Sequence, residues 1–505
     1  MAHETLTLPG WIQINGSPAE ATLTADGRLT WRVEGEPAER SLDLETEALG
    51  LGIEQERKIR VRAFVDDLGV ASSAASAAGG GGGRGSTRKR TRKDFMLEMP
   101  TEESVSIWSE RLKNCIDSFG RPKRLFIILN PYGGKKCAQN IFHSEVKPLL
   151  DAADVHYTLQ ETKFQLHAQQ IARELDLLKY DGIVCVSGDG VLVEVVNGLL
   201  KRDDWETAIK VPLGIIPAGS GNGMAKSLLD AANEMYSIAH ATFSVIRGHK
   251  RSLDVTTVMQ GETKFFSVLM LTWGLVADID IESEKYRWLG SARFDFYSLL
   301  RLANLRRYNG KIQFVPAPGY EMYGEPIQHD GEYKGNTGIP NISKQHVQGD
   351  GESVSQGGYS GPPSCLESSQ WRSLDGPFIS VWLNNVPWAS EKIMPAPEAK
   401  FSDGYLDAAI IKDCPKSALI SLLTKMADGT HANSPHVMYF KVKAFKLAPG
   451  QRVGSPTKGG IIDSDGEVLA RGEGTYQCHQ REDLMSYGPI QMTIDNGLAT
   501  IFTPR

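Results

Sequence analysis

The sequence lacks the cysteine spacings that mark zinc sites and dense disulfide frameworks. Its six cysteines lie far apart along the chain, and no two of them form a CxxC pair. This spacing predicts neither a zinc knuckle nor a disulfide-stapled fold. The first residues, Met1–Leu6, also lack the basic start and apolar core of a secretory signal. We therefore expect an intracellular, cytoplasmic chain with reduced thiols.

Long apolar runs and a strong net charge are missing as well. The longest apolar run, Phe265–Ala277, covers 13 residues and includes polar positions, whereas a membrane-spanning helix needs roughly 20 apolar residues. The formal net charge of -6 gives no general attraction to nucleic acid, so we expect no nucleic-acid partner. The GxxxxGK[ST] and GxGxxG signatures are absent from suitable contexts, which disfavours Walker-type NTPases and ordinary dinucleotide enzymes.

The 505 residues predict two or three folded units. Residues 1–66 alternate apolar and polar side chains around an Asp26–Gly27 turn, which predicts a small β-rich module. Residues 67–118 predict a flexible linker, because Gly69–Lys93 is rich in Ala, Ser and Gly and ends in the basic cluster Arg88–Lys93. That cluster could bind anionic lipid or serve as a localisation signal, and the ordinary interpretation is a run of solvated charges in a linker.

The remaining sequence predicts two lobes. Over residues 119–250, continuous apolar runs alternate with segments of helical spacing, which is typical of β–loop–α units around a buried parallel sheet. Residues 251–505 contain numerous alternating strand signals, interrupted by a polar segment at about 319–377 that we expect to be a disordered insertion. The predicted fold class is α/β, with a doubly wound parallel-sheet lobe followed by a β-rich antiparallel, sandwich-like lobe.

Three glycine-rich turns follow the three apolar strands of the first lobe. They are Asn130–Lys136, Ser187–Gly190 and Pro217–Asn222. Glycine lets the backbone approach a ligand closely, and the N–H groups and the start of the following helix favour phosphate oxygens. One such turn is weak evidence, but three at corresponding strand ends indicate a polyphosphate ligand. The first lobe is therefore predicted to bind a nucleotide.

Together these turns resemble the catalytic domain of the diacylglycerol kinase superfamily, in which the middle turn has a GGDGT-like pattern. Ser187–Val191 and Glu194–Gly198 are similar to sphingosine kinases in particular, as is the long string Trp273–Arg287. The resemblance covers about residues 121–310 and 375–467. The flanking module and the insertion make the arrangement similar to fungal long-chain-base kinases.

The resemblance implies a role for each matching residue. Asp189 becomes the candidate catalytic base, since a carboxylate near phosphates has a raised proton affinity; a cap for the helix expected from Val191 is the other interpretation. Asp280 would pair with the substrate amine. The residues implied on the nucleotide side are Asn130, Pro131, Tyr132, Thr162, Glu194, Gly219, Ser220, Gly221, Arg287, Arg293, Asp465, Gly466 and Glu467. Those implied around the acceptor are Ser187, Gly188, Asp189, Gly190 and Asp280.

Two features have an ordinary structural explanation beside the functional one. The acidic run Asp278–Glu284 could be a solvated helix face, and the apolar segments Phe294–Leu305 and Ser417–Met426 could be core helices. A sphingoid chain of about 16 methylenes, at roughly 0.8 kcal/mol each, needs a substantial apolar cavity. The two apolar segments are therefore candidates for a lipid gate that dips toward a membrane surface.

The resemblance thus implies an ATP- and Mg2+-dependent kinase for the primary hydroxyl of sphingoid long-chain bases, and we expect it to be peripherally associated with intracellular membranes. No metal-ligand spacing is visible, so Mg2+ is expected to arrive with ATP. An oligomer is possible. The alternatives are a ceramide or diacylglycerol kinase, and a non-catalytic lipid or nucleotide sensor.

Overall fold

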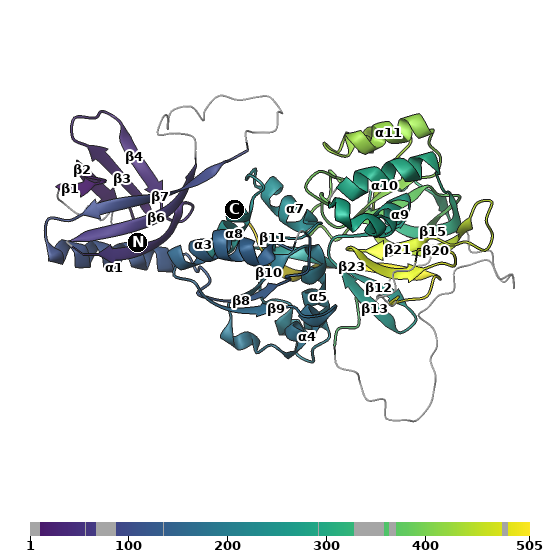
Figure 1. The fold of residues 1–505 in the computed structure, drawn as a ribbon, viewed down its shortest axis with the longest axis horizontal. Coiled ribbons are helices and arrows are strands. Elements are labelled where there is room, and N and C mark those ends of the chain that lie inside the picture. The colour runs from purple at the N-terminus through teal and green to yellow at the C-terminus, as the bar shows by residue number, and fades with distance from the viewer. Residues whose placement is uncertain are drawn as a thin grey trace.

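The computed structural model describes residues 11–55, 57–66, 87–134, 136–290, 292–327, 358–362, 370–476 and 483–505, apart from the side chain of Arg287. Three parts follow one another along the long axis in Figure 1: an N-terminal module, a first lobe and a second lobe. Among the described helices, none is both long and apolar enough to cross a bilayer.

The N-terminal module is a seven-stranded antiparallel sheet closed by one helix. Its strands run in the order β4-β3-β2-β1-β7-β6-β5. Helix α1 packs on this sheet through Val105, Trp108, Leu112 and Ile116, which recur at helical spacing. The elements are β1 (Trp11–Ile14), β2 (Ser17–Leu23), β3 (Arg28–Val33), β4 (Glu39–Asp43), β5 (Ala48–Glu54), β6 (Lys58–Asp66), β7 (Arg90–Glu98) and α1 (Glu102–Ser118).

The predicted linker over residues 67–118 is wrong for its second half. Arg90–Glu98 forms β7 between β1 and β6, and α1 follows it. Arg90 of the basic cluster is buried, and its guanidinium donates hydrogen bonds of 2.9 and 3.1 Å to the two carboxylate oxygens of Glu234. The charged residues on the exposed face of β7 made this segment resemble a linker, although it forms a strand. The glycine run, at residues 79–83, lies outside the described residues.

The first lobe contains the expected parallel sheet, in the order β9-β8-β10-β11. Helices α4 and α5 contribute to the core on one face, and α3 and α8 to the core on the other. The strands are β8 (Arg124–Leu129), β9 (His156–Glu161), β10 (Gly182–Ser187) and β11 (Leu213–Pro217). The helices are α2 (Ala138–Ile141), a π-helical turn (Phe142–Val146), α3 (Lys147–Ala152), α4 (His167–Glu174), a 3-10 turn (Leu177–Lys179), α5 (Asp189–Leu200), α6 (Trp205–Ala208), α7 (Gly223–Ala231) and α8 (Ile238–Arg247).

The second lobe is β-rich and largely antiparallel, as predicted. Its strands are β12 (Lys250–Gln260), β13 (Thr263–Ser267), β14 (Met270–Gly274), β15 (Tyr308–Pro316), β16 (Glu325–Pro326), β17 (Arg372–Asp375), β18 (Ser380–Asn384), β19 (Leu406–Ile411), β20 (Met438–Arg452), β21 (Ile461–Ser464), β22 (Glu467–Arg471) and β23 (Ile490–Phe502). Its helices are α9 (Leu275–Glu282), a 3-10 segment (Ser283–Leu289), α10 (Ala292–Ala303), α11 (Lys416–Lys425) and a 3-10 turn (Thr430–Asn433).

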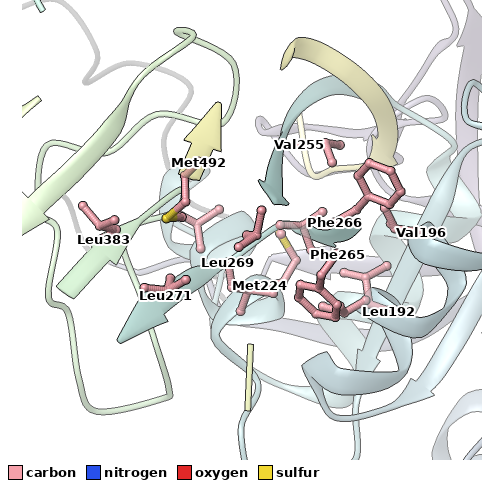
Figure 2. Close-up of a cluster of buried hydrophobic side chains, with 14 of the residues drawn as sticks. Leu192, Val196, Met224, Val255, Phe265, Phe266, Leu269, Leu271, Leu383 and Met492 are labelled. Carbon is pink, nitrogen blue, oxygen red and sulfur yellow. The ribbon is translucent and has the colours of Figure 1, made fainter. Parts of the chain in front are cut away.

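The two lobes are joined by a strand and by a shared core. Strand β23 pairs antiparallel with β12 and β20, and Ile501 near its end pairs in parallel with Leu213 of β11. Figure 2 shows Leu192 and Val196 of α5 beside Phe265 and Phe266 of β13 within one buried cluster. Buried apolar area of this kind holds the lobes together.

Parts of the insertion predicted at about 319–377 are ordered, in contrast to the predicted disorder. The ring of Tyr323 stacks on Phe440 with centroids 4.6 Å apart, and β16 pairs with β17. Gly358–Pro362 contacts both lobes. Aromatic side chains such as Tyr323 and Tyr359 supply enough apolar area to order these parts. Residues 328–357 and 363–369 lie outside the described residues.

Candidate active site

The three glycine turns meet at the carboxyl ends of β8, β10 and β11. A Cβ atom on Gly219 would lie 2.3 Å from Cα of Gly188, and one on Gly134 would lie 2.9 Å from the carbonyl carbon of Gly219. Backbone approaches this close exclude any side chain. Strand order reverses between β8 and β10, and open α/β sheets bind ligands at such a reversal. The turns therefore form one continuous backbone surface at the expected place.

The first turn and its neighbours have defined shapes. The side-chain oxygen of Asn130 accepts a hydrogen bond of 3.0 Å from the backbone N–H of Tyr132, which bends the chain around Pro131. The ring of Tyr132 is 65% exposed, whereas Thr162 is buried just beyond β9. Ser187 is also buried, and its hydroxyl donates to the carbonyl of Gly188. In the third turn, Ser220 is exposed between Gly219 and Gly221.

Asp189 is the first residue of α5, but its carboxylate binds the start of another helix. Its two oxygens accept hydrogen bonds from the backbone N–H groups of Gly223, at 2.6 Å, and Met224, at 3.1 Å, which open α7. Burial raises the pKa of Asp189 to about 7, against the lowering effect of these two bonds. A carboxyl group with that pKa can exchange a proton near neutral pH.

Glu194 of the first lobe and Glu467 of the second lobe lie near each other, on the side of Asp189 where the two lobes meet. A carboxylate oxygen of Glu194 accepts a 3.0 Å bond from the N–H of Ala168 at the start of α4. Glu467, which opens β22, accepts a 3.2 Å bond from the side chain of Gln165, and a Cβ on Gly190 would lie 3.8 Å from its Oε1. Burial, and then the negative charge of Glu467, raise the pKa of Glu194 to about 7.

Asp465 and Gly466 form the turn between β21 and β22, with φ angles of 56° and 81°. The buried Asp465 carboxylate accepts hydrogen bonds from the backbone N–H groups of Val268, Leu269 and Met270. Burial raises its pKa to about 6. The structure thus uses the Asp465 carboxylate to fix the turn between β13 and β14, and Glu467 is the carboxylate of this loop that contacts the first lobe.

Asp280, Arg287 and Arg293 lie on consecutive helical segments of the second lobe. Asp280 is half-buried on α9. Arg293 is buried near the start of α10, with its guanidinium carbon 4.5 Å from the ring centre of Phe294. Arg287 belongs to the 3-10 segment, and its side chain lies outside the described part of the molecule.

The sequence did not predict a buried charge network behind Asp280. Nη1 of Arg306 lies 3.1 Å from Asp278 and 2.9 Å from Glu282, two fully buried carboxylates on α9. The hydroxyl of Tyr308 donates to Asp278 at 2.6 Å, and that of Tyr297 donates to Glu282. Burial raises the pKa of Asp278, whereas hydrogen bonds from Arg306 and Tyr297 outweigh burial and lower the pKa of Glu282.

The spacing of the acidic residues in the run Asp278–Glu284 could have indicated this network. Asp278 and Glu282 are four residues apart and share one helix face, while Asp280 lies on another. The run is therefore a solvated face only in part, since Asp278 and Glu282 are core residues. The partner Arg306, which lies beyond α10, gives no local signal of its own.

Helices α10 and α11 are amphipathic and partly exposed. Tyr297 and Leu302 of α10, and Leu419 and Leu422 of α11, enter one buried cluster. On the outside, Leu299 is 65% exposed and Ile420 is 50% exposed. These helices thus pack into the core on one face and expose apolar side chains on the other, and the lipid gate stays a prediction.

Within the described residues, no group of three or more His, Cys, Asp or Glu side chains could hold a metal ion. Two carboxylates, Glu194 and Glu467, nevertheless lie close enough that the charge of Glu467 raises the pKa of Glu194. Their oxygen atoms have the chemistry that Mg2+ prefers.

Comparisons with known proteins agree with this architecture. Residues 124–258 match the family model of the diacylglycerol kinase catalytic domain. Residues 369–481 match that of the YegS C-terminal NAD kinase beta sandwich-like domain. The first match spans the three glycine turns, and the second includes Glu467.

Similarity to individual proteins extends over most of the chain. Sphingosine kinase 1 of Arabidopsis thaliana is 52% identical over 98% of this chain and 96% of its own length. Sphingosine kinase 1 of Homo sapiens is 32% identical over 74% of this chain and 92% of its own, and the human ceramide kinase is 29% identical over 69% and 66%. The Arabidopsis match also takes in the N-terminal module, which the sequence resemblance had left outside. With the fold, the converging glycine turns and full-length similarity of this extent, the chain belongs to the sphingosine kinase family.

Proposed function

We propose that this kinase transfers the γ-phosphoryl group of ATP to the primary hydroxyl of a sphingoid long-chain base, between its two lobes. The observation that carries the proposal is the meeting of three glycine turns around Asp189, with Glu467 of the second lobe beside them. Phosphoryl transfer needs positioned phosphates, a proton acceptor and an acceptor hydroxyl in line. The site offers groups for the first two.

Asp189 is the proposed proton acceptor. Burial raises its pKa to about 7, so the carboxylate has a much higher proton affinity than an exposed aspartate. The bonds from Gly223 and Met224 fix the carboxylate in one orientation without neutralising it. One side chain therefore anchors α7 and, in this proposal, takes the proton from the substrate hydroxyl. The hydroxyl oxygen attacks the γ-phosphorus while the bond from that phosphorus to the bridging oxygen breaks and ADP leaves.

The nucleotide is proposed to lie along the glycine turns, with Asn130, Thr162 and Ser220 nearby and Arg287 and Arg293 approaching its phosphates. A guanidinium can hold two phosphate oxygens at once. Mg2+ bound with ATP would neutralise charge on the phosphates. Glu194 and Glu467 are the carboxylates that would face it, and a cation there would relieve the repulsion between them.

The acceptor is proposed to be a long-chain base because of Asp280. A sphingoid base carries an ammonium group next to the hydroxyl that is phosphorylated, and a half-buried carboxylate pairs well with it. The names of the relatives support this substrate class. The exposed apolar face of α10 and α11 supports a peripheral contact with the membrane from which such a lipid is taken.

Three acceptors assayed side by side test the proposal. Sphingosine has a free amine, ceramide has the same hydroxyl with an acylated amine, and diacylglycerol has no amine. We expect label from γ-labelled ATP to enter sphingosine far faster than the other two. Equal or better transfer to ceramide or diacylglycerol would favour the alternative lipid kinases, and no transfer to any lipid would favour a non-catalytic sensor.

A further inference from the structure

A five-residue segment of the insertion, Gly358–Pro362, is bound at the junction of the two lobes. The backbone N–H of Tyr359 donates a 2.8 Å hydrogen bond to the carbonyl of Leu200. Its ring lies 4.5 Å from that of Trp205 and 5.8 Å from that of Phe266, centre to centre. Its hydroxyl donates to Asp495. One tyrosine therefore contacts the first lobe through α5 and α6 and the second through β13 and β23.

The shape of the bound segment depends on two glycines. Gly358 has a φ angle of 128°, and a Cβ there would lie 3.2 Å from the carbonyl oxygen of Leu200. Gly361 has a φ angle of 94°, and its Cβ would lie 3.1 Å from the side chain of Thr257. Ser360 between them is exposed. A backbone so closely fitted to its surroundings is a specific contact rather than a chance one.

The surface that receives the segment is itself preorganised. Asp495 on β23 accepts a 3.0 Å hydrogen bond from Thr257 on β12, which leaves its other oxygen for Tyr359. On the first lobe, the amide of Asn197 exchanges two hydrogen bonds with the backbone of Phe266, at 2.7 and 3.0 Å. These bonds hold the end of α5 against β13, where the ring of Tyr359 packs.

The helix that this segment contacts, α5, begins at Asp189. Helix α5 runs from Asp189 to Leu200, and the last carbonyl groups of a helix lack partners within it. Tyr359 supplies a donor to one of them and adds a second contact between α5 and the second lobe. Figure 2 shows α5 residues Leu192 and Val196 beside Phe265 and Phe266 in the core that this contact borders.

We propose that Leu200, Trp205, Thr257, Phe266 and Asp495 form a docking site for the chain's own motif Gly358–Pro362, and that the docked motif holds α5 and Asp189 in register with the second lobe. Tyr359 is then a positioning residue for phosphoryl transfer, about one helix length from the reacting atoms. The positioning role rests on the proposed function, whereas the docking itself can be tested without activity.

Binding of a peptide in trans tests the docking directly. In full-length Tyr359→Ala the site should be vacant, so a fluorescent peptide of residues 355–364 should bind it saturably and bind the wild type at least about tenfold more weakly, because the wild-type site is filled in cis. The peptide with Phe in place of Tyr359, or the double variant Tyr359→Ala/Trp205→Ala, should lose most of this binding. Equal peptide binding by wild type and Tyr359→Ala would overturn the proposal.

Hydrogen exchange and kinetics test the positioning role. Tyr359→Ala should increase amide exchange at the end of α5 and in β13 and lower kcat severalfold to tenfold, with smaller changes in the KM values for ATP and sphingosine. Tyr359→Phe should fall between it and wild type, and Ser360→Ala, at the exposed neighbour, should match wild type. Unchanged exchange and kcat in Tyr359→Ala would overturn the role.

Two further outcomes are distinguishable. If the wild type transfers no phosphate to sphingosine, the proposed function fails, while peptide binding and exchange still report on docking. If wild type sediments as a dimer that Tyr359→Ala dissociates, the motif docks on a second copy, and the intramolecular proposal is overturned.

Discussion

The carboxylate of Asp189 accepts a 2.6 Å hydrogen bond from the backbone N–H of Gly223, the first residue of α7. This bond ties the second glycine turn to the third. It also explains how an aspartate can be buried beside the glycine turns, since two backbone donors compensate part of its lost hydration. Burial still dominates, so the pKa of Asp189 rises to about 7.

The first prediction concerns the pH dependence of turnover. Asp189 accepts a proton only when ionised, so kcat should fall about tenfold per pH unit below its pKa of about 7 and level off above it. A rate profile from pH 5.5 to 9 with sphingosine and ATP measures this. A kcat that is flat from pH 5.5 to 7 would contradict the role of Asp189 as base.

The same pKa predicts an effect on stability with a definite sign. The folded state binds the Asp189 proton more tightly than the unfolded chain, whose pKa is near 3.8. The contribution of this group to the free energy of unfolding is therefore fully present below pH 3.8 and is lost as the pH rises to about 7. Urea unfolding of wild type and Asp189→Asn across this range should show a pH dependence that is reduced in the variant.

The third prediction concerns Arg306. Arg306→Met leaves Asp278 and Glu282 buried without their shared cation, which should lower the free energy of unfolding by roughly 3–5 kcal/mol. The neighbouring Arg307→Met is the control, because Arg307 pairs with the exposed Asp413 and should change stability by less than about 1 kcal/mol. Similar losses for the two variants in urea unfolding would argue against the network.

The fourth prediction tests the contact between Asp280 and the substrate headgroup. Asp280→Asn exchanges a charge-assisted bond for a neutral one, so we expect the KM for sphingosine to rise by roughly ten- to a hundredfold while the KM for ATP changes little. Glu284→Gln, four residues further on, is the matched control and should change neither constant. An unchanged sphingosine KM in Asp280→Asn would remove the argument for an amine-bearing substrate.

The junction of the N-terminal module with the first lobe provides a fifth prediction. Arg90→Met breaks the buried pair with Glu234 and should make the module detach, seen as faster proteolysis and a lower melting temperature. Arg92→Met, on the exposed face of the same strand, should resemble wild type. If both variants resist protease equally, the pair does not hold the module.

Local patterns were sufficient to predict the first lobe. The apolar runs that precede the three glycine turns in the sequence are Arg124–Leu129, Gly182–Val186 and Val211–Ile216, and they coincide with β8, β10 and β11 to within two residues. Continuous apolar runs followed by glycine turns leave little choice of structure. The convergence of the turns followed from parallel strand order alone.

Long-range contacts could not be predicted in the same way. Arg90 and Glu234 are 144 residues apart, and Tyr359 and Asp495 are 136 apart. Composition alone therefore predicted a linker where β7 lies and a disordered segment where Gly358–Pro362 is ordered. The partner of Asp189 was missed for a related reason, because a cap for its own helix is a local expectation and the bond to α7 is not.

The most direct test of the account is transfer of label from γ-labelled ATP to sphingosine by purified wild type and Asp189→Asn, with ATP binding measured on both. We predict a labelled lipid product with wild type, a loss of about 10²–10⁴-fold in kcat for Asp189→Asn, and similar ATP affinity in the two proteins. Near-normal kcat in Asp189→Asn, or no labelled sphingosine with wild type, would contradict it.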